Sequence, residues 1–172
     1  ASGSSAFTNL TVTNDATING LTVGKGAGSA STNTVVGNGA LASNSGGGSL
    51  VTAIGYQAGY TLNVVGTNGL TAIGYQAGNK YNTNSDNAGS TFIGNSSGKN
   101  TTTGLDNTFV GAASGLSNTT GNYNIAIGGN SLQANTTASN NTAVGYQAGY
   151  TNTTGLITAI GTQALYTSST AT

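Results

Sequence analysis

Short apolar segments recur along the chain, and each one ends at a glycine. Three residues, mostly β-branched or small, precede the glycine, as in TAIG at 52–55 and TAVG at 142–145. The apolar positions do not recur at the three- and four-residue spacing of a helix, and a glycine in every unit would cost a helix about 1 kcal/mol. The pattern predicts one short β-strand per segment, ended by a glycine in a backbone conformation that bulky residues avoid.

The segments are eight copies of one repeat, spaced 16 to 20 residues apart. Each anchor glycine follows Val or Ile, and Ala or Ser comes three residues later. The anchors are Gly37, Gly55, Gly74, Gly94, Gly111, Gly128, Gly145 and Gly161. A fixed period of this length indicates a solenoid, which tolerates length variation in its connectors. We predict an all-β fold over residues 33–165, a parallel β-roll or β-solenoid of about eight coils.

The three residues before each anchor glycine form columns on two faces, because side chains alternate along a strand. The first column is Thr, except for Ile125, the third is Val or Ile, and the central one is Ala, Phe or Val. We expect the Val/Ile column to be buried inside the roll and the central column to pack against another chain. One coil buries too little apolar surface to offset the entropy of ordering it. The sequence therefore predicts a homo-oligomer, and we expect a homotrimer.

The segments that flank the repeats differ from them. Residues 1–32 contain strand-like alternation and an Asn-Gly dipeptide at 19–20 that favours a hairpin. The apolar positions of this segment are Leu10, Val12, Ile18, Leu21 and Val23. We interpret it as a β-rich lead-in that connects to the first coil or caps it, since exposed solenoid ends invite strand addition. Residues 166–172 are expected to form a C-terminal tail. Without an initiating Met or a signal-peptide pattern, the chain is interpreted as a processed product or a fragment.

The composition offers little for catalysis. The chain has three Lys, three Asp, no His, no Cys and no Glu, and its net charge is zero. Asp15, Asp86 and Asp106 fall in different units, so we expect no acid–base pair, no metal site and no cofactor, and therefore no enzyme. A neutral chain does not attract nucleic acid. It has no apolar run of the ~20 residues that a membrane helix needs, so we expect no membrane insertion.

Two columns of residues, the Tyr and Gln positions that follow the anchor glycine, are candidates for glycan binding. Tyr56, Tyr75 and Tyr146 follow the glycine directly, and the next residue is Gln57, Gln76, Gln147 or, after another anchor, Gln163. Aromatic rings beside amides suit sugars, because rings pack on CH groups while amides hydrogen-bond hydroxyls. The alternative is that stacked Tyr and Gln side chains only stabilise one another.

The connector at 78–90 is a second candidate for binding, because it is the longest and most varied. It contains Lys80, Tyr81 and Asp86. A protruding loop of this kind can contact a glycan or a protein receptor, and the alternative is a solvated loop without a ligand.

Several copies resemble the head repeat of trimeric autotransporter adhesins, the YadA-like head. NTAVGYQA at 141–148 and NIAIGGNS at 124–131 match it closely, while STFIGNSS and NTFVGAAS carry Phe in place of the small residue. GYQAGYTNTTG at 145–155 is also similar to repeats of bacteriophage tail fibres. The resemblance covers residues 33–165. It implies a left-handed parallel β-roll with three chains side by side, displayed for surface attachment, and it specifies no ligand.

These observations predict an extracellular fibre segment, in a virion tail fibre or on a bacterial cell surface, that attaches to a host or target cell. Its expected partners are two copies of itself and a cell-surface glycan or protein receptor. The first alternative is a structural spacer or filament subunit that binds nothing. The second is ice binding by a flat Thr-rich face, which we disfavour because the Thr column shares its face with the Val/Ile column that we expect to be buried.

Overall fold

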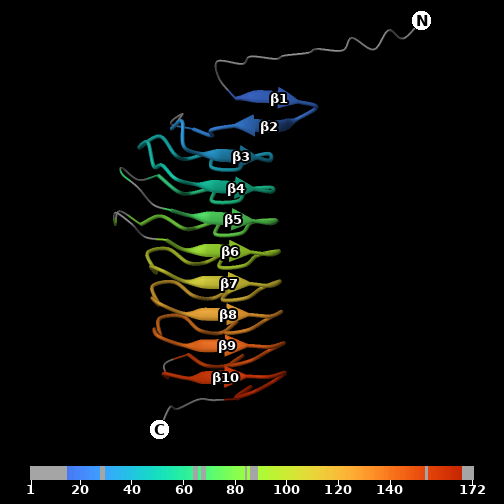
Figure 1. Ribbon diagram of the computed structural model, residues 1–172, viewed down its shortest axis with the longest axis vertical. Coiled ribbons are helices and arrows are strands. Elements are labelled where there is room, and N and C mark those ends of the chain that lie inside the picture. The colour runs from blue at the N-terminus through green and yellow to red at the C-terminus, as the bar shows by residue number, and fades with distance from the viewer. Residues whose placement is uncertain are drawn as a thin grey trace, which may run out of the picture.

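The fold is known from a computed structural model that describes residues 15–27, 30–63, 66, 69–83, 85, 89–153 and 155–167. In these residues it is all-β, with ten strands in one sheet stacked in chain order (Figure 1). The strands are β1 (Ala16–Ile18), β2 (Leu21–Gly24), β3 (Thr34–Val36), β4 (Thr52–Ile54), β5 (Thr71–Ile73), β6 (Thr91–Ile93), β7 (Thr108–Val110), β8 (Ile125–Ile127), β9 (Thr142–Val144) and β10 (Thr158–Ile160). Leu10, Val12, Asp86 and residues 168–172, for which we also made predictions, lie outside the described residues.

Strands β3 to β10 run parallel, and each pairs with the next in the same register. Ala53 of β4 lies opposite Ala72 of β5, for example, and Ala126 of β8 lies opposite Ala143 of β9. The chain therefore completes about one turn per repeat and forms a β-solenoid of about seven turns, with long connectors on one side of the strands and tight turns on the other (Figure 1). The prediction of an all-β parallel solenoid is confirmed.

The anchor glycines are required for two reasons. Their φ angles lie between 120° and 138°, a region that L side chains rarely adopt. In addition, a Cβ on Gly111 would lie 2.6 Å from the carbonyl oxygen of Gly128 in the next rung. The glycine column thus lets successive rungs approach closely at the point where each strand ends.

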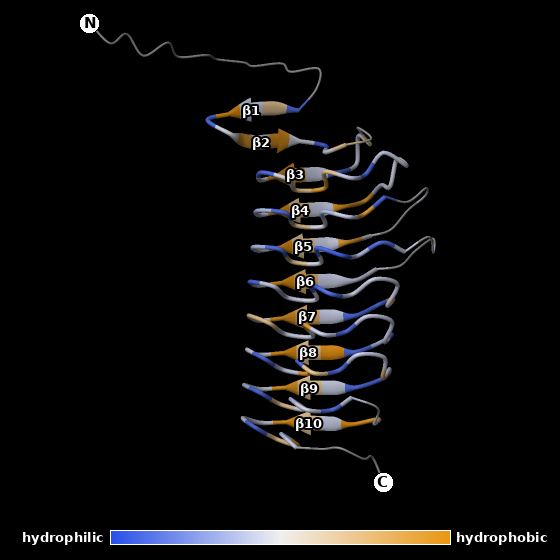
Figure 2. Ribbon diagram, turned by 180° about the vertical axis from the view of Figure 1, so that it is seen from behind, coloured by the Kyte–Doolittle hydropathy of each residue, from blue (hydrophilic) through white to orange (hydrophobic). Residues whose placement is uncertain are grey.

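The interior is built on the central residue of each strand. These residues are fully or almost fully buried: Val35, Ala53, Ala72, Phe92, Phe109, Ala126, Ala143 and Ala159. The outer residues of each strand point away from the interior and are partly or largely exposed, up to 70% for Ile160. We call these outer residues of β3 to β10 the strand face; their aliphatic members form a column along the solenoid (Figure 2).

The expected assignment of the two faces is therefore wrong. The central column is the interior of the coil, and the Thr and Val/Ile columns lie outside. After the anchor glycine the chain folds back under the central residue, so that the Ala or Ser three residues later and the Gly or Leu four residues later close the core over it. The turn direction, which hydrophobicity does not specify, decides which face is buried.

The size of the central residue limits the residue four positions after the anchor glycine: both Phe residues are matched with glycine there, whereas Leu occurs only with Val or Ala. The ring of Phe92 occupies the space beside Gly98, where a Cβ would lie 2.5 Å from its Cδ1. In the rung of β8 the central residue is Ala126, and Leu132, four residues after the anchor glycine, fills the core instead. Leu132 does so with a φ of 46°, a conformation that costs a non-glycine residue roughly 1 kcal/mol.

The half of the interior near the connectors is polar in several rungs. Asn107 and Asn118 both donate from Nδ2 to the carbonyl oxygen of Gly121, at 2.8 and 3.1 Å. Asn124 and Asn135 donate in the same way to Ala138, at 2.9 and 3.0 Å. These buried amides fix the short connectors, because they satisfy carbonyl groups that would otherwise have no partner.

The two positions of these asparagines lie four residues before and seven residues after the anchor glycine. Other rungs fill the same two positions with apolar side chains. The rung of β4 has Val51 and Leu62 there, and the rung of β5 has Leu70 and Tyr81, all fully or almost fully buried. In each complete rung the two positions are therefore either both polar or both apolar, as expected of side chains that share one internal space.

The predicted hairpin before the first repeat is confirmed. Strands β1 and β2 pair antiparallel around Asn19 and Gly20, whose φ angles are 49° and 79°. Strand β2 then pairs antiparallel with β3 and so occupies the edge of the first rung. The Asp15 carboxylate accepts hydrogen bonds from the backbone N–H groups of Lys25 and Gly26, at 2.7 and 2.9 Å, which fixes the hairpin to the chain that follows it.

Candidate functional site

The candidate tyrosine and glutamine side chains lie on the edge of the solenoid where the strands end. We call this edge the Tyr–Gln edge; it comprises Tyr56, Gln57, Tyr75, Gln76, Tyr146, Gln147 and Gln163. The glutamines adopt positive φ angles, 53° at Gln57 and 52° at Gln76. Their backbone N–H groups donate hydrogen bonds to the preceding rung; that of Gln76, for example, lies 2.8 Å from the Tyr56 carbonyl oxygen. The turn therefore places each tyrosine outward and in line with the rung beside it.

The predicted stacking of neighbouring rungs on this edge is confirmed. The rings of Tyr56 and Tyr75 have centroids 5.4 Å apart and are 13° from parallel. Beside them, Gln76 Nε2 donates to Gln57 Oε1 at 2.8 Å. Each ring covers one face of the other, and the two residues remain 45% and 49% exposed. The pair thus stabilises the ladder and also leaves phenol and amide groups open to solvent.

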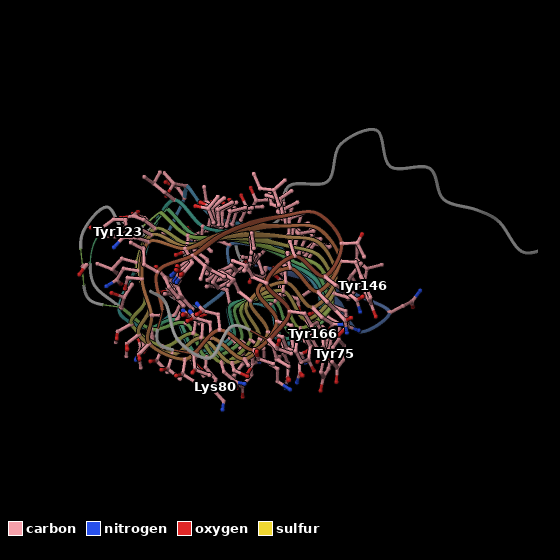
Figure 3. All side chains as sticks on the ribbon, turned by 90° about the horizontal axis from the view of Figure 1, so that it is seen from below. Tyr75, Lys80, Tyr123, Tyr146 and Tyr166 are labelled. Atoms are coloured by element: carbon pink, nitrogen blue, oxygen red, sulfur yellow. The ribbon has the colours of Figure 1, made fainter. Side chains whose placement is uncertain are left out.

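Tyr146 differs from that pair because its neighbours in the same column are small. The equivalent positions in the rungs before and after it are Gly129 and Thr162. A Cβ on Gly129 would lie 3.5 Å from Cδ2 of Tyr146, and Tyr146 is 51% exposed. No aromatic ring covers it in its own column, so Tyr146 is the better platform for stacking a ligand. Seen along the axis, it lies at the same end of the cross-section as Tyr75 (Figure 3).

Sequence reasoning missed a second row of tyrosines beside this edge. Tyr60, Tyr150 and Tyr166 lie five residues after their anchor glycines. The rings of Tyr150 and Tyr166 stack with centroids 4.9 Å apart and planes 10° apart. The signal was present as the second tyrosine of YQAGY at 56–60 and 146–150. Because Tyr60 is exposed and Tyr150 and Tyr166 are half-buried, the tyrosine surface is wider than the sequence interpretation indicated.

Of the second candidate, the connector at 78–90, the described residues Lys80 and Tyr81 lie in different surroundings. Lys80 is exposed and points outward from a long side of the cross-section (Figure 3). Tyr81 is fully buried and meets Phe92 edge to face, with centroids 5.5 Å apart. The expectation that Tyr81 belongs to a protruding loop is therefore wrong, because it fills the position that holds Asn in other rungs. Asp86 lies outside the described residues.

Burial dominates the electrostatics of Tyr81. Burial raises the pKa of the phenol to about 12. A hydrogen bond with Ser90 lowers this pKa, and the charge of the Asp106 carboxylate raises it further. Burial disfavours the phenolate because the charged form loses its hydration. Tyr81 is therefore a core residue with an OH partner, and it does not contribute to recognition of a ligand.

The described acidic side chains have structural partners. Asp106 Oδ1 accepts a hydrogen bond from the Gly89 N–H at 3.1 Å, and Asp15 holds the lead-in as described above. Within the part of the chain that the structure describes, no three acidic, His or Cys residues gather as a metal site. The same residues include no helix long and apolar enough to cross a membrane.

The strand face is the other large surface with a repeated chemistry. It presents Thr and Val/Ile in register along eight rungs, with Ile125 in place of Thr in β8. Ice binding was disfavoured because the Thr column was expected to share a buried face with the Val/Ile column. The face points outward, so that reason no longer holds. The aliphatic column, which is partly exposed, also becomes the surface where a partner would exclude water.

No protein-family model, curated protein or solved structure matches the sequence. Fold and surface together define the chain as a β-solenoid with an aliphatic strand face and a Tyr–Gln edge. The function is therefore argued from the repeat and from these two surfaces.

Proposed function

We propose that this chain is a segment of an attachment fibre, in which three copies stand side by side as left-handed parallel β-rolls. In this proposal the fibre is extracellular, on a bacterial cell surface or in a virion tail, and its repeats are of the YadA-like head type. One observation carries the proposal: every rung of the rod presents a Val or Ile outward on the strand face.

The strand face supports association because a column facing only water has no need of aliphatic side chains. Single exposed aliphatic residues are ordinary on protein surfaces, but contiguous apolar patches mark contact sites. Here the aliphatic residue recurs in all eight rungs, and the parallel pairing places these residues in one line. Copies packed through this face would cover that line and add the burial that a single coil lacks.

The Tyr–Gln edge is the proposed contact with the target cell. It lies beside the strand face and stays exposed when that face is covered, since its residues leave the strands after the anchor glycine. Its chemistry of phenol rings and uncharged amides fits a neutral glycan better than a charged ligand.

A glycan array and a cell-adsorption assay on the intact protein test this function. Tyr146→Ala is expected to weaken binding about tenfold, because a stacking platform is lost. Lys80→Ala is the matched variant, since Lys80 is exposed on a different side and belongs to the connector candidate. Loss of binding in Lys80→Ala alone would move the contact to the connector, and a protein that binds no glycan and no cell is a spacer.

Ice binding is a second candidate, and the outward Thr column favours it. Threonine hydroxyl and methyl groups line up in seven of the eight rungs of the strand face. Thermal hysteresis of the purified protein decides this candidate, because a face covered by other copies cannot contact ice. A freezing-point gap that disappears in Thr71→Asp would support ice binding and count against the fibre.

A further inference from the structure

The Tyr–Gln edge keeps the same backbone geometry from rung to rung. The residue two positions after the anchor glycine has a φ between 52° and 58° in every rung from β4 to β10. Its N–H donates to the carbonyl oxygen of the residue one position after the preceding anchor glycine, at 2.8 to 3.0 Å in all seven cases. The repeats differ in length by up to four residues, from 16 to 20, yet this edge advances evenly by about 4.8 Å per rung.

Tyr75 and Tyr146 lie at the two ends of one stretch of this edge. They occupy the same column in the rungs of β5 and β9, and the three rungs between them carry Asn95, Ala112 and Gly129 there. Four rung spacings separate the two tyrosines, which is about 19 Å. Both are half exposed and lie at the same end of the cross-section (Figure 3). The side of each tyrosine that faces this stretch therefore has no ring over it in its own column.

The polar groups along this stretch carry no charge. Gln76 and Gln147 directly follow the two tyrosines, and Asn95, Ser96 and Asn130 belong to the rungs between them. Ser96 Oγ donates to Asn95 Oδ1 at 2.9 Å on the exposed surface. Amide and hydroxyl groups donate to and accept from the hydroxyls of a sugar, whereas a charged ligand would find no opposite charge among them. The stretch therefore offers hydrogen bonds to a neutral ligand over its whole length.

The spacing of the rungs decides which kind of ligand can follow this edge. In a polysaccharide whose pyranose rings are joined through equatorial bonds at opposite ends, each ring advances the extended chain by close to one rung spacing. Successive sugars therefore meet successive rungs. An extended peptide does not match, because its side chains on one side recur every ~6.7 Å, whereas the rungs recur every ~4.8 Å. An α-linked glucan coils and leaves the line of the edge after a few rings.

We propose that the Tyr–Gln edge binds an extended, uncharged, β-1,4-linked polysaccharide that lies parallel to the solenoid axis, with one sugar ring per rung from Tyr75 to Tyr146. Five rings cover the five rungs from β5 to β9, and the two end rings pack their CH groups on the tyrosines. The inference rests on the proposed attachment function and adds the class, the direction and the length of the ligand. A sugar that contacts one tyrosine uses only one of the two platforms, so the affinity depends on chain length.

A length series tests the span of the site. Isothermal titration calorimetry of the natural protein uses cello-oligosaccharides and N-acetylated chito-oligosaccharides of two to six units, two neutral β-1,4-linked chains that differ at C2. In at least one series the affinity is expected to rise up to five units, to about tenfold above that of the two-unit sugar, and then to level off. The series that shows the gain identifies the substituent at C2. No gain beyond two units in both series would overturn the proposal.

Malto-oligosaccharides of the same lengths are the matched control for the shape of the ligand. They have the composition of the cello-oligosaccharides but an α-linkage, which coils the chain. Their affinity is expected to be independent of length, because a coiled chain does not stay on the line of the rungs. An equal gain with length in the malto- series would show that the edge does not select an extended chain, and would overturn the proposed match of periods.

Substitutions at both ends test whether the two tyrosines bind one ligand together. Tyr146→Ala removes one end. The other end needs the double variant Tyr56→Ala/Tyr75→Ala, because the ring of Tyr56 lies against Tyr75 and would replace it. Each variant is expected to bind the five-unit sugar no more tightly than the two-unit sugar, since only one platform is left. Circular dichroism checks that the variants keep the β-solenoid.

Tyr123→Ala is the matched control for these variants. Tyr123 is also an exposed tyrosine, 56% exposed, but it lies at the opposite end of the cross-section (Figure 3). This variant is expected to keep the full dependence on ligand length. A gain that survives in the double variant Tyr56→Ala/Tyr75→Ala, or that is lost in Tyr123→Ala, would show that the ligand does not extend from Tyr75 to Tyr146.

The two proposals fail separately. A protein that binds no glycan and no cell overturns the attachment function and this inference together. A protein that binds glycans through Tyr146, without a gain from two to five units in either β-1,4-linked series, keeps the attachment function. That result overturns only the extended polysaccharide and its direction along the edge.

Discussion

The rings of Phe92 and Phe109 stack in successive rungs, with centroids 5.5 Å apart and planes 27° apart. Each ring lies against the glycine six residues later in its own rung, Gly98 or Gly115. The core admits Phe in the centre only with this glycine, and it admits leucine at the glycine position only with a smaller central residue, as at Ala126 and Leu132. Where both residues are small, as at Ala53 and Gly59, leucines of the neighbouring rungs lie against the glycine. The two positions therefore act as one packing unit.

Gly98→Ala is expected to lower the free energy of unfolding by about 2–4 kcal/mol. The new Cβ would lie 2.5 Å from Phe92 Cδ1, and the alanine backbone would have to adopt a φ of 56°. Overpacking costs about 1–3 kcal/mol, and the left-handed backbone costs about 1 kcal/mol more. Urea denaturation followed by circular dichroism measures the change.

The same unit predicts coupling between two substitutions. Phe92→Ala alone creates a cavity and costs about 3–5 kcal/mol, and Gly98→Leu alone overpacks the core. Together they reproduce the arrangement of Ala126 and Leu132, so the double variant is expected to be more stable than the sum of the two effects predicts. Strict additivity would contradict the packing unit.

Gly111→Ala and Gly161→Ala are a matched pair that separates the cost of the positive φ angle from the cost of a clash with the next rung. Both glycines have positive φ angles, 131° and 120°. A Cβ on Gly111 would lie 2.6 Å from the Gly128 carbonyl oxygen, whereas one on Gly161 would meet nothing within 4 Å. We expect Gly161→Ala to cost about 1–2 kcal/mol and Gly111→Ala several kcal/mol, as read from thermal denaturation. Equal losses would show that only the φ angle matters.

Asn124→Ala is expected to lower the free energy of unfolding by about 1–3 kcal/mol, the cost of unsatisfied buried groups. Asn124 Oδ1 accepts from the Asn141 backbone N–H at 3.0 Å, and its Nδ2 donates to the Ala138 carbonyl oxygen at 2.9 Å. The exposed Asn95 gives the control, since Asn95→Ala should change stability by less than about 0.5 kcal/mol. Hydrogen exchange at the Asn141 amide, which should become faster in Asn124→Ala alone, locates the effect.

Tyr81 is expected to make the protein sensitive to alkali. Its pKa is raised from 10.0 to about 12 in the folded state, so the stabilisation from keeping the phenol neutral is complete below pH 10. It is lost as the pH rises through 12, because the unfolded chain releases the proton more readily. Denaturation midpoints measured from pH 9 to pH 12 should fall for the natural protein and fall less for Tyr81→Phe. Parallel curves would contradict this assignment.

The sequence predicts the repeated elements of this fold well, because they depend on local chemistry. The eight anchor glycines and the hairpin at Asn19 and Gly20 follow from residues that tolerate positive φ angles, and the in-register parallel strands follow from the regular period of the repeat. The stacking of Tyr56 on Tyr75 follows in turn from the register. These predictions required only the period and the alternation of side chains.

The inside and outside of the coil could not be predicted in the same way. Both columns of each strand are apolar, and hydrophobicity favours burial of Ile54 over burial of Ala53, which is the opposite of the structure. The interior is thin, so its centre admits Ala, or admits Phe where a glycine leaves room. Tyr81 was misplaced for a related reason: its position is recognised as internal only when it is aligned with Leu62 and Asn118, seven residues after their own anchors.

The pairing of interior residues within rungs sets the unit in which this rod can change length. A whole rung brings its own glycine turn, its own matched core residues and its own connector bonds, so adding one extends the shaft by about 4.8 Å and leaves its girth unaltered. An insertion or deletion inside a rung would separate Phe92 from Gly98, or Asn107 from Asn118, and would disrupt the packing of the interior. Duplication in whole repeats is thus the tolerated route by which such a shaft grows or shrinks.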